Sequence, residues 1–223
     1  MKKLAIFDFD GTLFAKDALP YIGKVWKAQT ANIFRYYLIY LQIIPALILY
    51  KLKIISRNTL KPWAINKFNK IFKEMSEEEI QKLFYSTYFL IKPYFNTVIV
   101  DEIKTAQKEG YYTVLLSGCY TGLLEVIAEY LKIDIVIGMN LPFKNGTFDS
   151  NASIPFIDGE TKQKLLEITF SKENIDWQKS RSYADSISDL PILISVGEPV
   201  VVNPEPKLLE IAQNNNWRIL IER

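Results

Sequence analysis

Most of the chain consists of short, almost wholly apolar runs that alternate with segments in which apolar residues recur at helical spacing. The first apolar run covers residues 4–9 and stops at Asp10-Gly11, a pair typical of turns. A run with so few polar positions is typical of a strand that is buried on both faces of a parallel sheet. The sequence therefore predicts that the chain opens with a buried strand.

From residue 97 onward, helices and strands are expected to alternate. The expected helices cover 98–108, 122–131, 161–170, 189–195 and 207–214, and the expected strands cover 112–116, 133–137, 181–184, 199–202 and 217–221. Asn145-Gly146, at the centre of 139–154, predicts a small β-hairpin. Repeated strand-helix units with right-handed crossovers predict an α/β fold, a doubly wound, Rossmann-like parallel sheet.

A different pattern interrupts these units after the first strand. Residues 16–93 contain few helix breakers, and Ser76 with Glu79 forms the signature of a capping box at a helix start. Pro93 is expected to end that helix. We therefore predict an inserted α-helical cap over residues 16–93 and a core domain made of residues 1–15 and 94–223.

One stretch of the predicted cap, residues 36–50, is uncharged and strongly apolar. At about 15 residues it is shorter than the roughly 20 that cross a bilayer, and it contains Gln42 and Pro45. We expect a buried helix of the cap here. The alternatives are a helix that lies on a membrane surface or at a partner interface and, less favoured, a transmembrane span.

The composition excludes several kinds of chemistry. The 223 residues include one cysteine and no histidine, which excludes an intrachain disulfide, nucleophilic systems that need histidine, and zinc sites with histidine ligands. Apolar residues make up 49% and charged residues 23% of the chain, as is usual in soluble globular proteins. Four apolar residues separate Lys3 from Asp8, too few for a signal peptide. We expect a cytoplasmic protein.

Charge is distributed unevenly. The segment from residue 18 to residue 73 has no acidic residue, and its charges are Lys24, Lys27, Arg35, Lys51, Lys53, Arg57, Lys61, Lys67, Lys70 and Lys73. Together with the apolar run, this basic charge suggests that the cap contacts an anionic membrane peripherally. In the cell the contact would be on the inner face of the membrane. An ordinary solvated helix face is the alternative. We expect no nucleic-acid partner and predict no particular oligomeric state.

Two carboxylates follow the first strand, at the edge where open α/β sheets place their ligands. Asp8 and Asp10 are two residues apart, so on a regular strand their side chains share a face. One carboxylate can hold a divalent cation and attack a phosphorus atom, while the other handles the proton. The alternative is that Asp10-Gly11 is only a turn and that Asp8 only ends the strand.

Similar residues follow two other predicted elements. Ser117-Gly118 ends the strand at 112–116 and can donate hydrogen bonds to a phosphate oxygen, although Ser-Gly is also an ordinary turn. Lys162 begins a helix, where the helix dipole disfavours a cation; neutralising a phosphate would explain it. A solvated lysine and a role for Lys164 instead are the alternatives. Cys119 is expected to be a packing or loop residue.

Asp185 and Asp189 follow the strand at 181–184. Carboxylates clustered at one sheet edge repel one another unless a cation lies among them. These two residues are therefore candidate ligands of the same metal ion as Asp8.

Together these residues resemble a known family. Phe7-Asp8-Phe9-Asp10-Gly11-Thr12-Leu13, Ser117-Gly118, Lys162 and Asp185-Ser186-Ile187-Ser188-Asp189 are similar, in order, to the four motifs of the haloacid dehalogenase-like phosphatases. The insertion after the first motif resembles the small helical cap of the phosphoserine phosphatase-like subclass. The resemblance covers the core, about two thirds of the chain, and is faint in the cap.

The resemblance implies a role for each of these residues. Asp8 would be the nucleophile that forms an aspartyl-phosphate, and Asp10 the acid and base. Ser117, Gly118 and Lys162 would hold the phosphoryl oxygens. Mg²⁺ would be bound by Asp8, by the backbone carbonyl of Asp10 and by Asp185, with Asp189 in support. Tentative substrate contacts are Asp17, at the offset of an acidic residue that binds an amine, and Arg57, for a carboxylate.

The expected function is Mg²⁺-dependent hydrolysis of a small phosphorylated metabolite, similar to phosphoserine. The loop Ser186-Ile187-Ser188 departs from the glycine- and asparagine-rich version of true phosphoserine phosphatases. One alternative is a phosphatase of a phospholipid headgroup, such as phosphatidylglycerophosphate or lysophosphatidate, with its basic cap at the membrane surface. Another is a non-catalytic phosphate-binding or interaction protein on the same scaffold.

Overall fold

The first strand lies inside a parallel sheet. The computed structural model describes residues 1–30 and 32–221, without the side chains of Arg57 and Asn58. β1 (Leu4–Phe7) is buried at all four positions and pairs in parallel with β2 on one side and β6 on the other. The sheet has six strands in the order β3-β2-β1-β6-β7-β8, and all of its pairings are parallel. The predicted α/β fold with a parallel sheet is confirmed.

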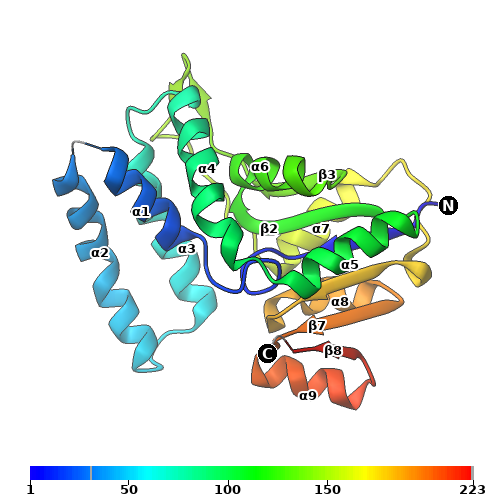
Figure 1. Ribbon diagram of the computed structural model, residues 1–223. Coiled ribbons are helices and arrows are strands. Elements are labelled where there is room, and N and C mark those ends of the chain that lie inside the picture. The colour runs from blue at the N-terminus through cyan, green and yellow to red at the C-terminus, as the bar shows by residue number, and fades with distance from the viewer. Residues whose placement is uncertain (31, 222–223) are drawn as a thin grey trace.

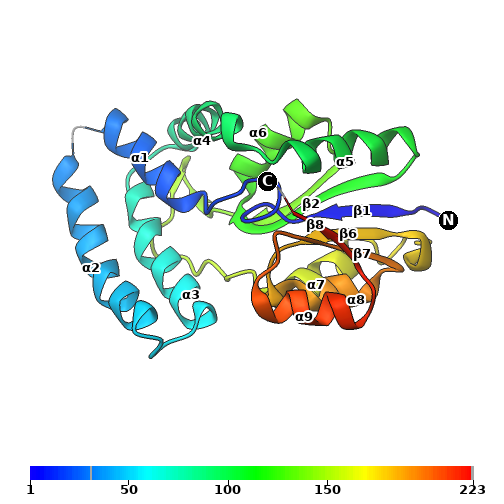
Figure 2. The ribbon, with the colours of Figure 1, turned by 60° about the horizontal axis from the view of Figure 1, so that its bottom comes forward.

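Helices cover both faces of this sheet, as the alternating pattern predicts (Figure 2). α5 (Thr97–Lys108) and α6 (Thr121–Leu131) pack on one face, where Phe7 lies, and α7 (Gly159–Thr169) packs on the other face with Ile6. α8 (Leu190–Ser195) and α9 (Pro206–Asn214) lie on the same side as α7. The remaining strands are β2 (Tyr112–Tyr120), β3 (Ile135–Met139), β6 (Arg181–Ala184), β7 (Glu198–Val202) and β8 (Arg218–Leu220).

The hairpin forms around the predicted turn but is shorter than the segment expected for it. β4 (Phe143–Lys144) and β5 (Thr147–Phe148) are antiparallel, and Asn145 and Gly146 between them have φ angles of 52° and 77°. Positive φ at both central residues is the conformation for which Asn-Gly is favoured. The segment that follows β5 crosses toward α7 without further strand structure.

The segment between β1 and α5 is helical. It contains α1 (Leu19–Gln29), α2 (Ile33–Lys51), α3 (Arg57–Phe68) and α4 (Glu77–Ile91), with 3-10 turns at Asn69–Phe72 and Lys92–Tyr94. The capping box of Ser76 and Glu79 starts α4, as predicted. In Figure 1, α1 to α3 stand beyond one edge of the sheet. The cap boundaries at residues 16 and 93 stay a prediction, since α4 contacts both α1 and α6.

The expectation of a buried helix at the apolar run is wrong. α2 is 19 residues long, four more than the run, and only Ile39 and Ile43 of it are buried. Among the described residues, α2 is the one helix whose length and composition would let it cross a bilayer. Its neighbours α1 and α3 cover one side of it and leave the other uncovered (Figure 1).

Candidate active site

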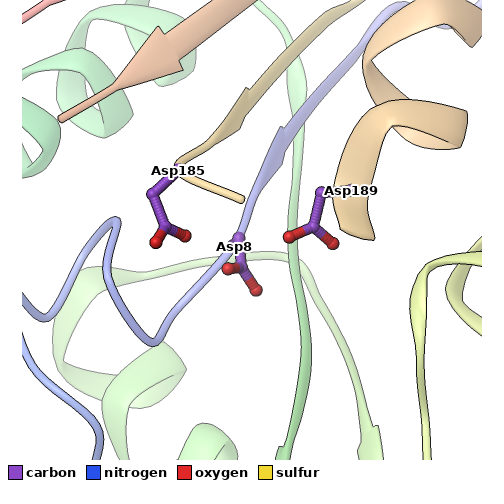
Figure 3. Close-up of side chains that lie close together, drawn as sticks. All are labelled: Asp8, Asp185 and Asp189. Atoms are coloured by element: carbon purple, nitrogen blue, oxygen red, sulfur yellow. The ribbon is translucent and has the colours of Figure 1, made fainter. Parts of the chain in front are cut away.

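Three carboxylates from distant parts of the chain meet at one edge of the sheet (Figure 3). Asp8 follows β1, Asp185 follows β6, and Asp189 immediately precedes α8. Each offers an oxygen atom, and the three oxygens lie within 4.8 Å of one another. Asp8 and Asp189 are buried, so water screens their mutual repulsion only weakly. The predicted convergence of these residues is present in the structure.

This group of oxygens suits a hard divalent cation, because such ions take carboxylate oxygens as ligands. Burial raises the pKa of Asp8, and the Lys162 ammonium opposes that rise. A cation bound among the three carboxylates would hold them in their ionised forms. The residues present therefore fit a divalent metal ion.

Lys162 joins two members of this group. Its Nζ lies 2.8 Å from Oδ1 of Asp8 and 2.5 Å from Oδ1 of Asp189. Burial acts to lower the pKa of Lys162, but the charges of Asp189 and Asp8 outweigh it and raise that pKa above its ordinary value. Lys164, the alternative considered from the sequence, is exposed to solvent. The lysine of the site is therefore Lys162.

The start of α7 explains how Lys162 reaches the carboxylates. Asp158 caps the helix by accepting a 2.9 Å hydrogen bond from the backbone N–H of Thr161. The next residue, Gly159, packs directly against the loop that carries Asp189. A Cβ atom at this position would lie 1.5 Å from the carbonyl oxygen of Ser188. The absence of a side chain at residue 159 thus lets the first turn of α7 approach the site.

Asp10 lies beside the cluster of three carboxylates, but its own side chain contacts other residues. One of its carboxylate oxygens accepts a 2.8 Å hydrogen bond from the backbone N–H of Ala18. Burial raises the pKa of Asp10 to about 7, and the positive charge of Lys61 opposes the rise. Its side chain is not among the three that can share a metal ion. Metal binding by its backbone carbonyl stays a prediction.

Ser117 and Gly118 lie in β2, the strand next to β1, and their binding of a phosphoryl group stays a prediction. Ser117 is buried, and its Oγ accepts a 3.2 Å hydrogen bond from the backbone N–H of Cys119. A Cβ atom on Gly118 would lie 2.8 Å from the carbonyl oxygen of Ile157. Cys119 is buried, and burial raises the pKa of its thiol well above the ordinary value, which suits a packing role better than a nucleophilic one.

One cavity of about 250 Å³ lies between the sheet edge and α1 to α3, and the candidate catalytic, phosphate-binding and metal-binding residues of the core border it. Asp8, Asp10, Ser117, Gly118, Lys162, Asp185 and Asp189 line its floor. The cap side is mostly apolar, and α2 and α3 supply Ile43, Leu47, Leu60, Ala64, Ile65 and Phe68. The floor of the cavity is thus charged, and its roof is apolar.

The tentative substrate residues have different outcomes. Asp17 lines the cavity and pairs with Lys61, whose Nζ lies 3.7 Å from its Oδ1. The side chain of Arg57 lies outside the described part of the structure, so its proposed contact stays a prediction. Lys61 also lines the cavity, a position that its sequence pattern did not predict. Lys61 lies three residues before Ala64, so the two side chains share a face of α3. The sequence alone does not show that this face points toward the cavity.

Thr12 is a second residue of the site that the sequence pattern did not predict. It is fully buried, and its hydroxyl donates a 3.4 Å hydrogen bond to Oδ1 of Asp185. It follows Gly11, whose φ of 89° lets the backbone pass close to the carboxyl group of Asp185. The turn after β1 thus helps to place a carboxylate that follows β6.

The sequence is similar to known proteins along most of its length. The profile of the haloacid dehalogenase-like hydrolases matches residues 5–193. A phosphoserine phosphatase of Haemophilus influenzae is 25% identical over 115 residues, which make up 52% of this chain and 37% of that protein. A histidinol-phosphatase of Neisseria meningitidis is 26% identical over a gapped alignment of 235 positions that covers 99% of each chain.

The fold also has solved counterparts. A crystal structure of a Bordetella pertussis protein of unknown function superposes with a TM-score of 0.80 at 20% identity, covering 99% of this chain and 98% of the other. At that identity the likeness concerns the fold alone. The chain spans less than half the length of the first curated relatives it matches, which include the Haemophilus protein.

Proposed function

The chain belongs to the haloacid dehalogenase-like hydrolase family, and we propose that it hydrolyses phosphate monoesters of small metabolites, with Asp8 as nucleophile and Mg²⁺ as its metal. The observation that carries this proposal is the meeting of three carboxylates and one buried lysine at the floor of a single cavity. A tetrahedral anion bound there would meet both a nucleophile and positive charge.

Asp8 is the residue assigned to attack. Lys162 holds its Oδ1, and we assign Oδ2 to the phosphorus atom. A bond forms between this oxygen and phosphorus while the bond from phosphorus to the leaving oxygen breaks, which gives an aspartyl-phosphate. Water then attacks the same phosphorus, releasing inorganic phosphate and restoring the carboxylate of Asp8.

The remaining groups position the phosphoryl group and balance its charge. Lys162 and the hydroxyl of Ser117 lie at the cavity floor beside Asp8, where they can donate hydrogen bonds to phosphoryl oxygens. Asp8, Asp185 and Asp189 would hold the metal ion, which when bound neutralises the charge that the phosphoryl group carries. Phosphoryl transfer depends mainly on such positioning and neutralisation.

Asp10 is the residue assigned to proton transfer. The hydrogen bond from the N–H of Ala18 fixes its carboxyl group beside the cavity, two residues from the nucleophile. In the first step it gives a proton to the leaving alcohol, and in the second it takes one from the attacking water. The cap then acts as a roof that limits the access of water.

The cavity favours a leaving group with an apolar body. Its cap side is formed mostly by apolar side chains, and its charged pair there, Asp17 and Lys61, already interact with each other. Serine, a small alcohol with an amine and a carboxylate, would leave much of this roof uncontacted. The ring of histidinol would contact more of it, and the similarity to a histidinol-phosphatase extends over the whole chain.

A phospholipid phosphate monoester is a second candidate, favoured by the way the apolar roof continues into α2. Ile43 and Leu47 line the cavity, and α2 exposes further apolar side chains on its other side. An acyl chain could contact the apolar roof of the cavity. The two candidates share the chemistry at Asp8 and differ only in the leaving group.

Hydrolysis of p-nitrophenyl phosphate with Mg²⁺ and with a chelator tests the proposal. We expect Mg²⁺-dependent turnover that Asp8→Asn abolishes and that Asp101→Asn, on the exposed side of α5, leaves unchanged. A folded wild-type protein with no turnover would instead support the non-catalytic alternative. Phosphoserine, histidinol phosphate and lysophosphatidate, compared by kcat/KM, then separate the leaving groups.

A further inference from the structure

The outer side of α2 carries an exposed apolar stripe, and this outer stripe is defined by Phe34, Leu38, Leu41, Ile44, Ile48 and Leu52. These residues recur at intervals of three or four, so they lie along one side of the helix and the turn that follows it. The exposed fractions of Phe34, Leu41 and Ile48 are 72%, 64% and 51%. Apolar surface of this extent on a folded domain indicates a binding partner.

The opposite side of α2 is already in use. Ile39 and Ile43 are buried in the core, and Ile43 and Leu47 line the cavity. α2 is therefore apolar on both sides, and the cap itself covers only one of them. Both views of the fold show α2 at the margin of the molecule, with α1 and α3 beside it on its inner side (Figures 1 and 2).

Positive charge accompanies the outer stripe. Lys51, the last residue of α2, and Lys53, in the turn that follows, are both exposed, and Lys24 is exposed on α1. The segment from residue 18 to residue 73 contains no aspartate or glutamate. A surface that combines exposed apolar side chains with exposed cations is complementary to an anionic bilayer, which offers hydrocarbon below a layer of negative headgroups.

The same charges disfavour a second copy of the chain as the partner. A two-fold symmetric interface places the same surface on both sides. Lys51 and Lys53 would then lie at the shared surface in both copies, and the segment from residue 18 to residue 73 offers no acidic residue on either side to pair with them. A membrane span is also disfavoured, because it would withdraw Ile39 and Ile43 from the core in which they are buried.

We propose that α2 lies in the plane of an anionic membrane surface, with its outer stripe in the interfacial region and Lys51 and Lys53 against the headgroups. In the cell this places the protein on the inner face of the membrane. The cavity wall formed by Ile43 and Leu47 would then stand on the other side of the same helix. This inference is independent of the proposed reaction, since it requires no catalytic group.

Co-flotation with vesicles tests the proposal, using phosphatidylcholine alone and phosphatidylcholine mixed with phosphatidylglycerol. The wild-type protein should bind the anionic vesicles at low salt and much less at high salt, because salt screens charges at the surface. The triple variant Phe34→Gln, Leu41→Gln, Ile48→Gln should bind about 100-fold more weakly. Lys51→Gln with Lys53→Gln should weaken binding about 10-fold or more.

Two controls make the test specific. Ile168→Gln with Ile194→Gln changes side chains that are 68% and 65% exposed on α7 and α8, away from the cap, and should leave vesicle binding unchanged. Asp8→Asn should bind vesicles as the wild type does, which separates docking from catalysis. All variants are first checked for wild-type melting temperature, so that weaker binding is not a result of unfolding.

The proposal is overturned if the folded wild-type protein does not bind anionic vesicles at low salt. It is also overturned if the triple variant binds as well as the wild type. A dimer in sedimentation equilibrium that the triple variant converts to a monomer, with no vesicle binding by either protein, would assign the outer stripe to a second copy and equally overturn it.

Discussion

Lys162 and Asp8 are 154 residues apart in the sequence, yet Nζ of the lysine lies 2.8 Å from Oδ1 of the aspartate. The contact joins the first turn of α7 to the end of β1. It is buried, and Asp189 shares the same ammonium group. Loss of the lysine would leave two buried carboxylates close together without their cation.

Lys162→Ala should therefore weaken both the fold and the proposed reaction. Without added metal we expect the free energy of unfolding to fall by about 3–5 kcal/mol, since a buried pair loses one partner. Turnover should fall by about 10²–10³-fold. Urea unfolding and the p-nitrophenyl phosphate assay measure the two effects. Lys164→Ala should change the free energy of unfolding by no more than about 0.5 kcal/mol and leave turnover unchanged. Equal losses in both variants would show that Lys162 has no special position.

Asp185→Asn should weaken metal binding more than it weakens the fold. The substitution removes one of the three carboxylates that can share an ion, and we expect the Mg²⁺ concentration for half-maximal activity to rise by about 10-fold or more. A Mg²⁺ titration of activity measures it, with Asp101→Asn as the matched exposed control. An unchanged Mg²⁺ requirement in Asp185→Asn would remove residue 185 from the metal site.

Gly159→Ala should disturb the site without touching a charged group. The new Cβ would meet the backbone carbonyl of Ser188, which cannot turn aside as a side chain can. We expect a loss of about 1–3 kcal/mol in unfolding free energy, together with reduced turnover as Lys162 shifts from Asp8. Glu160→Ala, at the exposed next position, is the control. Wild-type stability and activity in Gly159→Ala would mean that this close approach is unimportant.

Glu102 predicts a pH dependence of stability. Burial acts to raise its pKa, but hydrogen bonds from Arg218 and Tyr183 outweigh it, so the pKa in the folded state is lowered. The stabilisation is therefore complete above the unfolded-state pKa of about 4.3 and is lost as the pH falls through the lower folded-state value. We expect Glu102→Gln to cost about 1 kcal/mol at neutral pH.

Urea unfolding at pH 7 and at stepwise lower pH measures this effect. The stability curves of the wild type and Glu102→Gln should converge toward acid pH, and Tyr183→Phe, which removes one of the donors, should lie between them at pH 7. If the two curves run parallel from neutral to acid pH, Glu102 does not contribute as described.

The core and the positions of its charged residues were predictable for a simple reason. Buried strands such as residues 4–7 have a distinctive apolar pattern, and the carboxyl ends of parallel strands meet at one edge of the sheet. Asp8 and Asp185 follow such strands and Ser117 lies in the carboxyl-terminal half of β2, so their order in the sequence was enough to bring them together. Only local details differed, such as the extension of β2 to Tyr120 through a shift in its register with β3.

The cap was less predictable, because its geometry depends on how helices pack against one another. Lys61 faces the cavity owing to the rotation of α3 about its axis, which the sequence of α3 does not define on its own. The apolar run of α2 suggested burial, the usual fate of such helices, yet most of α2 is exposed. A pattern of apolar residues predicts a surface that is removed from water, but it does not predict which element or partner packs against that surface.

The identity of the nucleophile is the central claim, and trapping the phosphorylated residue tests it most directly. Protein turning over p-nitrophenyl phosphate with Mg²⁺ is quenched in acid and reduced with borohydride, which converts an aspartyl-phosphate to homoserine. Peptide mass spectrometry then locates the change. We predict homoserine at residue 8, dependent on substrate and Mg²⁺ and absent from residues 10, 185 and 189. Homoserine at another aspartate, with residue 8 unmodified in an active protein, would contradict the account.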